Sequence, residues 1–330
     1  MVRIAIAGGS GNVGQEIIEA LVAREKHEIL ILSRKDAPAT ELAFGVKWVK
    51  VDYSDAEHLA KALEGVHTVL SFLTGTVDPG SKTQGNTQRD LIDASIRAGV
   101  KRFAPSEWVT SKFDHMFWYA FKEDARKYLA EVNKEKKVLE YTLFQPGLFT
   151  NYFTFPFSSS KHVDVLETPF DFYQRRALMI DGGEDDILTL TTSQDVAKVV
   201  ALAIEHEGEW PLVSGIRGGE ITVGQLIALG EKIRGGSFAV EKLKAEDLEA
   251  GEVKAPWMPI ANHPAIPPEM RNAFSASLVS GILLGISAGN FKITDEWNQL
   301  LPDYKFTKPE EFLTKAWGAI DAGAKSVYLD

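Results

Sequence analysis

A glycine-rich turn near the start of the chain has the residue types and spacing of a phosphate-binding loop. The apolar run 2–7 leads directly into it, and a helical pattern follows over 15–24. Its glycines permit a sharp turn and close approach of the backbone to a pyrophosphate, which amides at the positive end of the helix would hold. A turn without a ligand is the alternative, but the strand before and the helix after favour a dinucleotide site. The predicted turn is Gly8-Gly9-Ser10-Gly11-Asn12-Val13-Gly14.

A basic turn is predicted where the second strand ends. Ser33 is followed by Arg34 and Lys35, whereas NAD-selective sites carry an acidic side chain near this point for the ribose 2′-hydroxyl. A guanidinium can bind a 2′-phosphate through paired, charge-assisted hydrogen bonds, so this turn favours NADP over NAD. A solvated basic turn is the alternative, and Asp36 is expected to lie too far along the loop to interfere. Asp52, after the third strand, is placed to contact the adenine.

Lys122 is the candidate for proton transfer. It lies near the start of a predicted helix, and its apolar and aromatic neighbours disfavour the ammonium form and lower the pKa of the amine. The alternative is a lysine on a charged helix face, because four charged residues follow within the next five positions. Tyr119, about one helical turn earlier, is a secondary candidate. His115 and His162 could assist, although we favour a surface role for each, and neither has metal-ligand spacing with another histidine.

Strand and helix patterns alternate up to about residue 150, and the elements that they predict would position these groups. Such alternation is typical of a Rossmann-type α/β fold, a doubly wound parallel sheet whose ligands bind beyond the carboxyl ends of the strands. That rule adds Phe72, which ends the fourth strand, and Ser106, which follows the fifth, to the predicted cofactor site. The predicted strands are 3–7, 28–33, 46–51, 68–72, 102–105 and 141–145, and the predicted helices are 14–24, 56–63, 83–98 and 117–133.

The pattern changes beyond residue 150. The segment 149–173 is irregular and rich in aromatic residues, whereas 187–207 restores a strand and a helix. We therefore expect a Rossmann domain over 1–150, to which 187–214 return, and a smaller mixed α/β lobe over 151–186 and 215–330 that binds the substrate. Within this lobe, 274–291 is predicted to form a buried helix, because serines and glycines interrupt its apolar run.

Composition excludes several classes of site. The 330 residues include 46 acidic and 36 basic ones, and a net charge of −10 argues against a nucleic-acid surface. The chain has no cysteine, which excludes disulfides, thiolate metal sites and cysteine nucleophiles. No metal site emerges from the spacing of the other residues. Since the first strand begins almost at the amino terminus, we expect no secretion signal and a cytoplasmic protein without a membrane anchor.

The glycine-rich turn, the Lys122 helix and two further segments together resemble the NmrA-like branch of the atypical short-chain dehydrogenases, near the isoflavone reductases and phenylcoumaran benzylic ether reductases. The resemblance covers most of the amino-terminal half, with a weaker match through Asp195. It implies that Lys122 is the acid/base and also contacts the nicotinamide ribose. The usual Tyr-x-x-x-Lys pair is absent, since Trp118 stands four positions before the lysine, which agrees with reductases that use the lysine alone. The matching segments are 8–14, 88–107, the Lys122 helix and Gln145-Pro146-Gly147-Leu148-Phe149 with Tyr152-Phe153.

The resemblance also implies where nicotinamide and substrate would lie. The backbone of Gln145, Pro146 and Gly147 would lie against the nicotinamide, and the aromatic rings that follow would form the floor of a substrate pocket. Each ring taken alone is better explained as core filling. As a group, next to a cofactor loop, they favour a flat aromatic or polyketide-like substrate. These rings belong to Phe149, Tyr152 and Phe153.

The expected protein is an NADPH-dependent reductase of an aromatic secondary metabolite, active as a monomer or homodimer. Hydride from the nicotinamide would reach a carbonyl, enone, quinonoid or benzylic carbon, and Lys122 would exchange the proton. Two alternatives stay open because fold does not fix function. One is a non-catalytic regulator that senses the dinucleotide and binds a partner protein. The other is a non-redox isomerase or cyclase that keeps the cofactor only as a structural element.

Overall fold

The computed structural model describes residues 1–74, 87–261 and 268–329. The chain forms two compact units, each built from several segments. The first unit consists of Met1–Trp108, Trp118–Phe144 and Val196–Ser214. The second unit consists of Val109–Phe117, Gln145–Asp195 and Gly215–Asp330.

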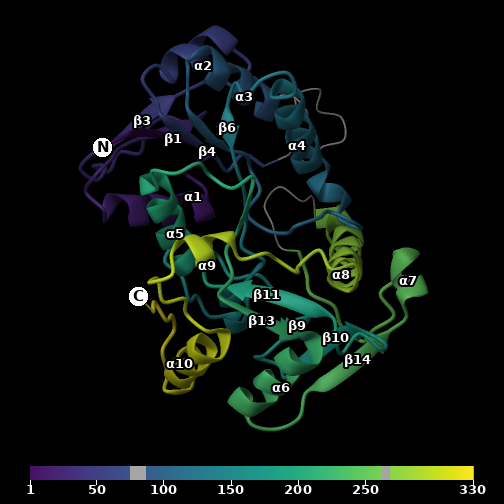
Figure 1. Cartoon of the computed structure of the whole chain (residues 1–330). Helices are drawn as coiled ribbons and strands as arrows, with labels where there is room; N and C mark the ends of the chain where they lie inside the picture. The colour runs from purple at the N-terminus through teal and green to yellow at the C-terminus, as the bar shows by residue number, and fades with distance from the viewer. Residues whose placement is uncertain (75–86, 262–267, 330) are drawn as a thin grey trace. The chain divides into compact units, whose positions relative to one another are not determined.

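The first unit is built on a six-stranded sheet in the order β3-β2-β1-β4-β5-β6, whose paired strands are all parallel (Figure 1). This order confirms the predicted Rossmann-type fold. It reverses direction between β1 and β4, the place where such sheets bind their ligands. The elements are β1 (Arg3–Ala7), α1 (Asn12–Val22), β2 (Glu28–Ser33), β3 (Val46–Lys50), α2 (Ala56–Ala62), β4 (Thr68–Ser71), α3 (Thr87–Arg97), β5 (Arg102–Ala104), α4 (Ala120–Val132) and β6 (Glu140–Tyr141).

The central strands of this sheet have nearly continuous apolar sequences because they are buried. The central strand β1 is covered on both faces, and Ala5 is paired with Leu30 on one side and Val69 on the other. Leu59 of α2 and Leu91 of α3 belong to the same core cluster as these residues. Helices that cover a parallel sheet in this way leave its strand ends as the surface on which polar groups can be presented.

Two predicted elements differ from the structure. The predicted strand 141–145 is divided, because Thr142 donates a hydrogen bond from its hydroxyl to the carbonyl of Pro211 (2.5 Å) and the chain then changes partner. Its first part is β6 in the large sheet, and its second part, β7 (Leu143–Gln145), pairs with β12 (Val213–Gly215). The predicted helix 117–133 begins as a 3-10 turn, η1 (Phe117–Tyr119), before α4. Residues 83–86 of the predicted helix 83–98 lie outside the described residues.

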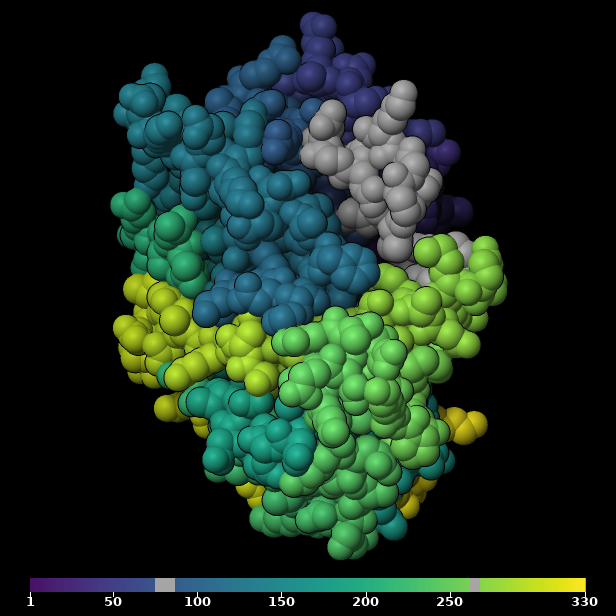
Figure 2. Space-filling model, turned by 90° about the vertical axis from the view of Figure 1, so that its right-hand side faces the viewer, coloured from purple at the N-terminus to yellow at the C-terminus, as the bar shows by residue number. Residues whose placement is uncertain are grey.

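The second unit combines two small mixed sheets with helices. One sheet has the order β14-β10-β9 and the other β13-β11-β8. The green atoms of the segment from β13 to α7 form much of the surface of this unit that faces the viewer in Figure 2, next to teal and yellow atoms. The elements are β8 (Leu148–Phe149), η2 (Thr150–Thr154), β9 (Phe170–Asp171), β10 (Arg176–Ile180), β11 (Ile187–Thr191), β13 (Gly219–Thr222), α6 (Val223–Arg234), β14 (Ala239–Leu243), α7 (Ala245–Glu249), η3 (Pro268–Met270), α8 (Arg271–Ser287), α9 (Glu296–Leu300) and α10 (Pro309–Asp321). Helix α5 (Ser193–Glu205) belongs to the first unit from Val196 onward.

Helix α8 contains most of the predicted helix 274–291. Eight of its residues are buried, including Gly281 and Gly285. A Cβ at Gly285 would lie 2.7 Å from the Cε of Met116, so the small residue allows close packing inside the second unit. Within the part of the chain that the structure describes, no helix combines the length and apolar character needed to cross a membrane.

Candidate functional site

The turn between β1 and α1 brings backbone very close to backbone. Gly8 has a φ of +75°, and a Cβ there would lie 3.0 Å from the carbonyl carbon and oxygen of Phe72, just after β4. A Cβ at Gly14 would lie 2.9 Å from the Cα of Gly9, so α1 packs directly onto the turn. Glycine is therefore required at these positions for steric reasons, as in dinucleotide-binding turns.

The start of α1 has the charge distribution that an anion needs. The amides in the first turn of a helix have no acceptor within the helix, and their partial positive charge attracts phosphate. Helix α1 begins at Asn12 after Gly11, and its first turn carries no acidic side chain that would compete. The side chain of Gln15 donates to the carbonyl of Ser10 at 2.8 Å and holds the turn. Geometry and charge together fit the pyrophosphate of a dinucleotide.

The turn after β2 presents two exposed cations. Ser33 is buried and its hydroxyl accepts a hydrogen bond from the backbone N–H of Lys35 at 3.1 Å, while Arg34 and Lys35 are exposed. Asp36 forms an ion pair with Lys50 at 2.6 Å, so its charge is balanced by a residue outside the turn. The turn has the composition needed to recognise a phosphate.

Asp52 follows β3 and shapes its own loop. Its carboxylate accepts hydrogen bonds from the backbone N–H of Ser54 at 2.9 Å and from its hydroxyl at 2.7 Å. These bonds lower the pKa of Asp52. The side chain is exposed and ionised at neutral pH, and its contact with the adenine stays a prediction.

Lys122 is buried near the start of α4, with 6% of its surface exposed. Its Nζ donates to the carbonyls of Ser106 at 2.8 Å and of Glu107 at 2.6 Å. The same atom lies 4.8 Å from the ring centroid of Tyr119 and 5.2 Å from that of Phe121. Lys122 therefore does not belong to the solvated face of α4, which was the alternative interpretation of its sequence neighbourhood.

Burial lowers the pKa of Lys122 to about 8, the Glu107 carboxylate opposes this shift, and the Arg126 guanidinium reinforces it. A group with this pKa can both give and take a proton near neutral pH. An ammonium has three N–H donors and an amine has two, so both carbonyl hydrogen bonds can persist after a proton is lost. The nitrogen can exchange a proton without moving.

An ion pair between a buried carboxylate and a partly exposed guanidinium lies beside this lysine. Glu107 is 1% exposed, and its carboxylate accepts hydrogen bonds from Nε and Nη2 of Arg126 at 2.9 and 2.5 Å. Neither residue was among the site residues predicted from the sequence. The signal that could have indicated the pair is spacing, because Arg126 follows Lys122 by four positions and so shares its helix face.

An aromatic stack fixes the loop that supplies the two carbonyls. Trp108 has a φ of +61°, and its ring stacks on Phe72 at 4.5 Å and on Phe144 at 5.3 Å. Its indole N–H donates to the carbonyl of Ser71 at 2.7 Å. Non-glycine residues with positive φ cluster at functional sites, where the surrounding structure holds them. The glycine turn follows β1 and the Lys122 loop follows β5, and Phe72, at the end of the intervening strand β4, contacts both.

Tyr119 contacts the lysine through its ring face. Burial raises the pKa of Tyr119 to about 12, so its hydroxyl holds its proton at neutral pH. Its predicted part in proton transfer is untested, whereas the cation–π contact with Lys122 is a role that the geometry defines.

The predicted nicotinamide loop lies in the second unit. The carbonyl of Pro146 accepts a hydrogen bond from the Thr191 hydroxyl at 2.7 Å, and the carbonyl of Gln145 accepts one from the backbone of Ile216 at 3.0 Å. Gly147 has a φ of +74°, and a Cβ there would lie 2.3 Å from the carbonyl oxygen of Thr189. The loop is rigidly held, as a surface against a planar ring requires.

Gly147→Ala is expected to destabilise the protein by roughly 2–5 kcal/mol, from left-handed backbone strain and overpacking together. The matched control is Gly182→Ala, because Gly182 has a φ of +80° and a Cβ there would meet no atom within 4 Å. It should cost only the backbone term, about 1–2 kcal/mol. Urea unfolding of both variants measures the difference, and equal losses would contradict the packing argument.

The predicted substrate-pocket rings divide into two groups. Phe149 and Tyr152 contact each other, with ring centroids 5.6 Å apart, and Tyr152 is only half-buried. Phe153 is 1% exposed and packs against Phe170 and Phe172. Its contacts are those of a core residue, which favours the structural alternative for this position. Substrate contact by the other two rings stays a prediction.

Neither histidine proposed as an assistant contacts Lys122 in a described interaction. His115 is exposed with a φ of +63°, and His162 is half-buried, both in the second unit. Among the residues with described positions, no cluster of three or more histidine and carboxylate side chains could hold a metal ion.

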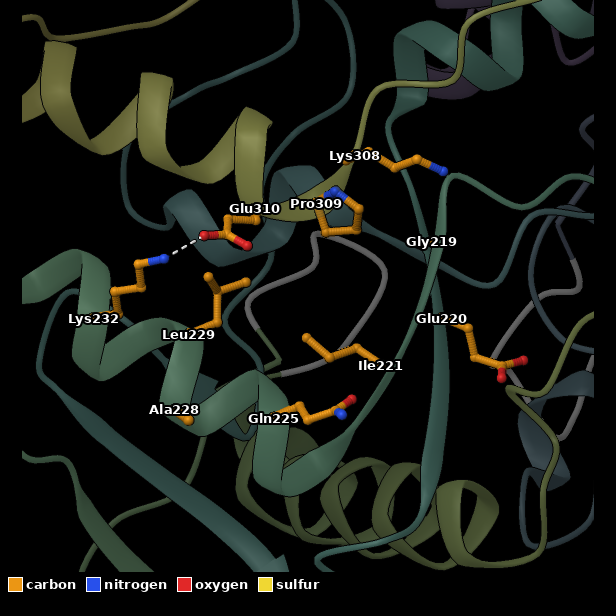
Figure 3. Close-up of a pocket in the computed structure, with 10 residues that line it drawn as sticks. All are labelled: Gly219, Glu220, Ile221, Gln225, Ala228, Leu229, Lys232, Lys308, Pro309 and Glu310. Atoms are coloured by element: carbon orange, nitrogen blue, oxygen red, sulfur yellow. Dashed lines mark hydrogen bonds and ion pairs between the residues drawn. The ribbon is translucent and has the colours of Figure 1, made fainter.

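A pocket of about 560 Å³ opens on the second unit between β13, α6 and the start of α10 (Figure 3). Lys232 and Glu310 form an ion pair across it at 2.6 Å. The described residues that line it include none of those predicted for the site. They are Gly219, Glu220, Ile221, Gln225, Ala228, Leu229, Lys232, Lys308, Pro309 and Glu310.

A second pocket, of about 700 Å³, lies on the first unit and is lined by His27, His67 and Arg102 among others. These residues stand at the amino ends of β2, β4 and β5. Dinucleotides bind at the opposite, carboxyl ends of such strands. The geometry therefore favours the glycine turn over this pocket as the cofactor site.

Comparisons with known proteins show the family and the fold of the chain. The sequence matches the NmrA-like family over residues 2–276. It is 30% identical over 323 residues to Oxidoreductase BOA1 of Botryotinia fuckeliana, covering 94% of this chain and 100% of that protein. Two solved structures share the fold. AtPrR2, solved with NADP+ and (+)-pinoresinol, has a TM-score of 0.66 at 19% identity and covers 95% of this chain and 98% of its own. The NADPH complex of the quinone oxidoreductase QOR2 from Escherichia coli has a TM-score of 0.68 at 21% identity and covers 94% and 99%.

Proposed function

The chain belongs to the NmrA-like family, and we propose that it is an NADPH-dependent reductase of an aromatic or polyketide-like small molecule. Membership confirms the resemblance found in the sequence. The observation that carries the proposal is Lys122, a buried amine with a pKa lowered to about 8 beside a dinucleotide-type turn. A relative whose match covers 94% of this chain is an oxidoreductase by name, which supports the same reaction class.

The residues of the first unit would hold the cofactor in two places. The amides at the start of α1 would bind the pyrophosphate, and Arg34 with Lys35 would bind the 2′-phosphate of the adenosine ribose. When bound, NADPH supplies a hydride at its nicotinamide carbon. Similar folds were solved with NADP+ and with NADPH, which supports this cofactor for the present chain.

Lys122 would supply the proton. Reduction of a carbonyl or enone adds a hydride to carbon and a proton to oxygen, and the Lys122 ammonium gives up that proton to become an amine. The carbonyls of Ser106 and Glu107 keep the nitrogen in place in both states. Solvent protons then restore the ammonium. For a quinonoid or benzylic substrate the same nitrogen would exchange its proton with the phenolic oxygen.

The substrate class rests on the aromatic pair of Phe149 and Tyr152 in the second unit, of which the half-buried Tyr152 has ring surface on which a flat molecule can stack. AtPrR2 was solved with (+)-pinoresinol, an aromatic ligand, which supports this choice. We infer a carbonyl, enone, quinonoid or benzylic carbon as the hydride acceptor.

Binding of NADPH, NADP+, NADH and NAD+ to the purified chain, measured by calorimetry, tests the cofactor part of this proposal. We expect tight binding of NADPH and much weaker binding of NADH. Similar affinities for NAD+ and NADP+, with poor binding of both reduced forms, would instead support a dinucleotide-sensing regulator.

A further inference from the structure

We propose that Glu107 and Arg126 form a positioning pair for Lys122, which fixes its amine against the two loop carbonyls and balances the charge around it. This inference rests on the proposed role of Lys122 in proton transfer. It assigns a task to a buried carboxylate and its partly exposed guanidinium partner, neither of which the reaction itself consumes.

The ion pair adds a second connection between the loop and α4, next to the hydrogen bonds of Lys122. Glu107 accepts from Lys122 through its backbone carbonyl at 2.6 Å and from Arg126 through its carboxylate at 2.9 and 2.5 Å. Lys122 and Arg126 stand one helical turn apart on the same face of α4. One loop residue therefore holds two residues of the helix, by its main chain and by its side chain. Displacing either end of the ion pair would shift α4, and with it the Lys122 amine, relative to the carbonyls that orient it.

The loop that contains Ser106 and Glu107 is anchored independently of the ion pair. Trp108 follows Glu107 directly, and its indole is fixed by the hydrogen bond to Ser71 and by stacking on Phe72 and Phe144. The backbone N–H of Trp108 also donates to the carbonyl of Phe144 at 3.0 Å. Because the loop is fixed, the ion pair positions α4, and with it Lys122, against the loop.

The charges of the pair act on Lys122 in opposite directions. The Glu107 carboxylate raises the pKa of Lys122 and the Arg126 guanidinium lowers it, while burial accounts for the largest lowering. The remaining titratable group that faces the amine in the described structure is Tyr119, which presents its ring and stays neutral. Without Arg126 the Glu107 carboxylate would favour the ammonium form of Lys122, and without Glu107 the Arg126 guanidinium would favour the neutral amine. The pair avoids both extremes.

Titration of Lys122 by NMR, with ¹³C-labelled lysine in the full-length chain without nucleotide, tests this directly. Lys122→Arg identifies the resonance by its disappearance. In Glu107→Gln the charge of the guanidinium is no longer balanced and is expected to lower the pKa of Lys122 by about 1 or more. In Arg126→Gln the carboxylate is expected to raise this pKa by a similar amount. Arg126→Lys keeps the charge and should restore a value close to that of the wild type.

The matched control is Glu205→Gln, which breaks another two-pronged ion pair of the first unit, that of Glu205 with Arg24 at 2.7 Å. It should leave the titration of Lys122 unchanged. If Glu107→Gln does not fold, Glu107→Asp compared with Arg126→Gln and Arg126→Lys still separates charge from geometry. The shorter aspartate should preserve the pKa of Lys122 but lower kcat.

Shifts of opposite sign in the two neutral variants support the positioning pair. Shifts of the same sign, or no shift, would overturn it, because a merely structural ion pair would lower stability without this signature. The proposed function is tested separately. If the Lys122 pKa moves as expected but the pH–rate profile does not follow it, Lys122 is not the proton donor, although the pair still sets its charge. If the pKa of Lys122 does not move in Glu107→Gln and Arg126→Gln while Lys122→Met abolishes turnover, the proposed positioning pair is wrong and the proposed reductase function is supported.

Discussion

Replacing Lys122 with methionine is expected to lower kcat by about 10²–10⁴-fold, the usual contribution of a positioned acid or base. Methionine has a similar length and can lie against the rings of Tyr119 and Phe121, but it cannot carry a proton. The glycine turn and the basic turn are unchanged, so the Kd for NADPH should stay close to that of the wild type. Steady-state kinetics together with calorimetry measure both quantities.

Lys122→Arg is the control for charge. Arginine keeps the donors and the positive charge but does not release its proton in proteins. It should therefore be as inactive as the methionine variant. Because methionine leaves the carbonyls of Ser106 and Glu107 without their donor, thermal unfolding of each variant must accompany the kinetics. Full turnover by folded Lys122→Met would remove this residue from the mechanism.

Arg34→Ala is expected to weaken NADPH binding by about 10–100-fold, because hydrogen bonds to a charged group contribute about 1.5–3 kcal/mol. Binding of NADH, which lacks the 2′-phosphate, should hardly change. The preference for NADPH would then disappear without any loss of fold, since Arg34 is exposed. Calorimetric titration with both nucleotides measures the effect.

Lys47→Ala provides a charge-matched control for this experiment. Lys47 is an exposed cation of β3, paired with Glu28 at 2.6 Å, and lies toward the amino end of that strand. Its removal changes the net charge equally but should leave the ratio of NADPH to NADH affinity intact. A similar loss of preference in both variants would show that general electrostatic attraction, and not contact at the basic turn, selects the cofactor.

The fold of the first unit could be predicted because its signals are local. Apolar runs such as that of β1 and the glycines at the end of that strand record burial and close backbone approach directly in the sequence. The division of 141–145 could not be predicted in this way. It depends on pairing with β12, about seventy residues later, and on the side-chain hydrogen bond of Thr142. Periodicity carries no information about such distant partners.

The candidate site was predictable to a similar extent. Lys122 and the glycine turn have recognisable neighbours, but the sequence left open whether the lysine lies on a solvated face. Its burial follows from the loop at Ser106 and Glu107, and that loop depends on the stacking of Trp108. The Glu107–Arg126 pair is formed across a loop and a helix, so only the spacing of Arg126 could have indicated it. For Phe153 the aromatic pattern predicts a substrate contact, whereas the structure buries this ring in the core.

Transfer of deuterium from the nicotinamide C4 of labelled NADPH to a product, measured by mass spectrometry, separates a reductase from a regulator that only binds the dinucleotide. The purified chain would be incubated with a panel of aromatic enones, quinones and benzylic ethers. We expect a product that carries one deuterium at the reduced carbon, formed by the wild type and lost with Lys122→Met. NADPH that binds tightly but transfers no deuterium to any member of this panel would contradict the proposed reductase.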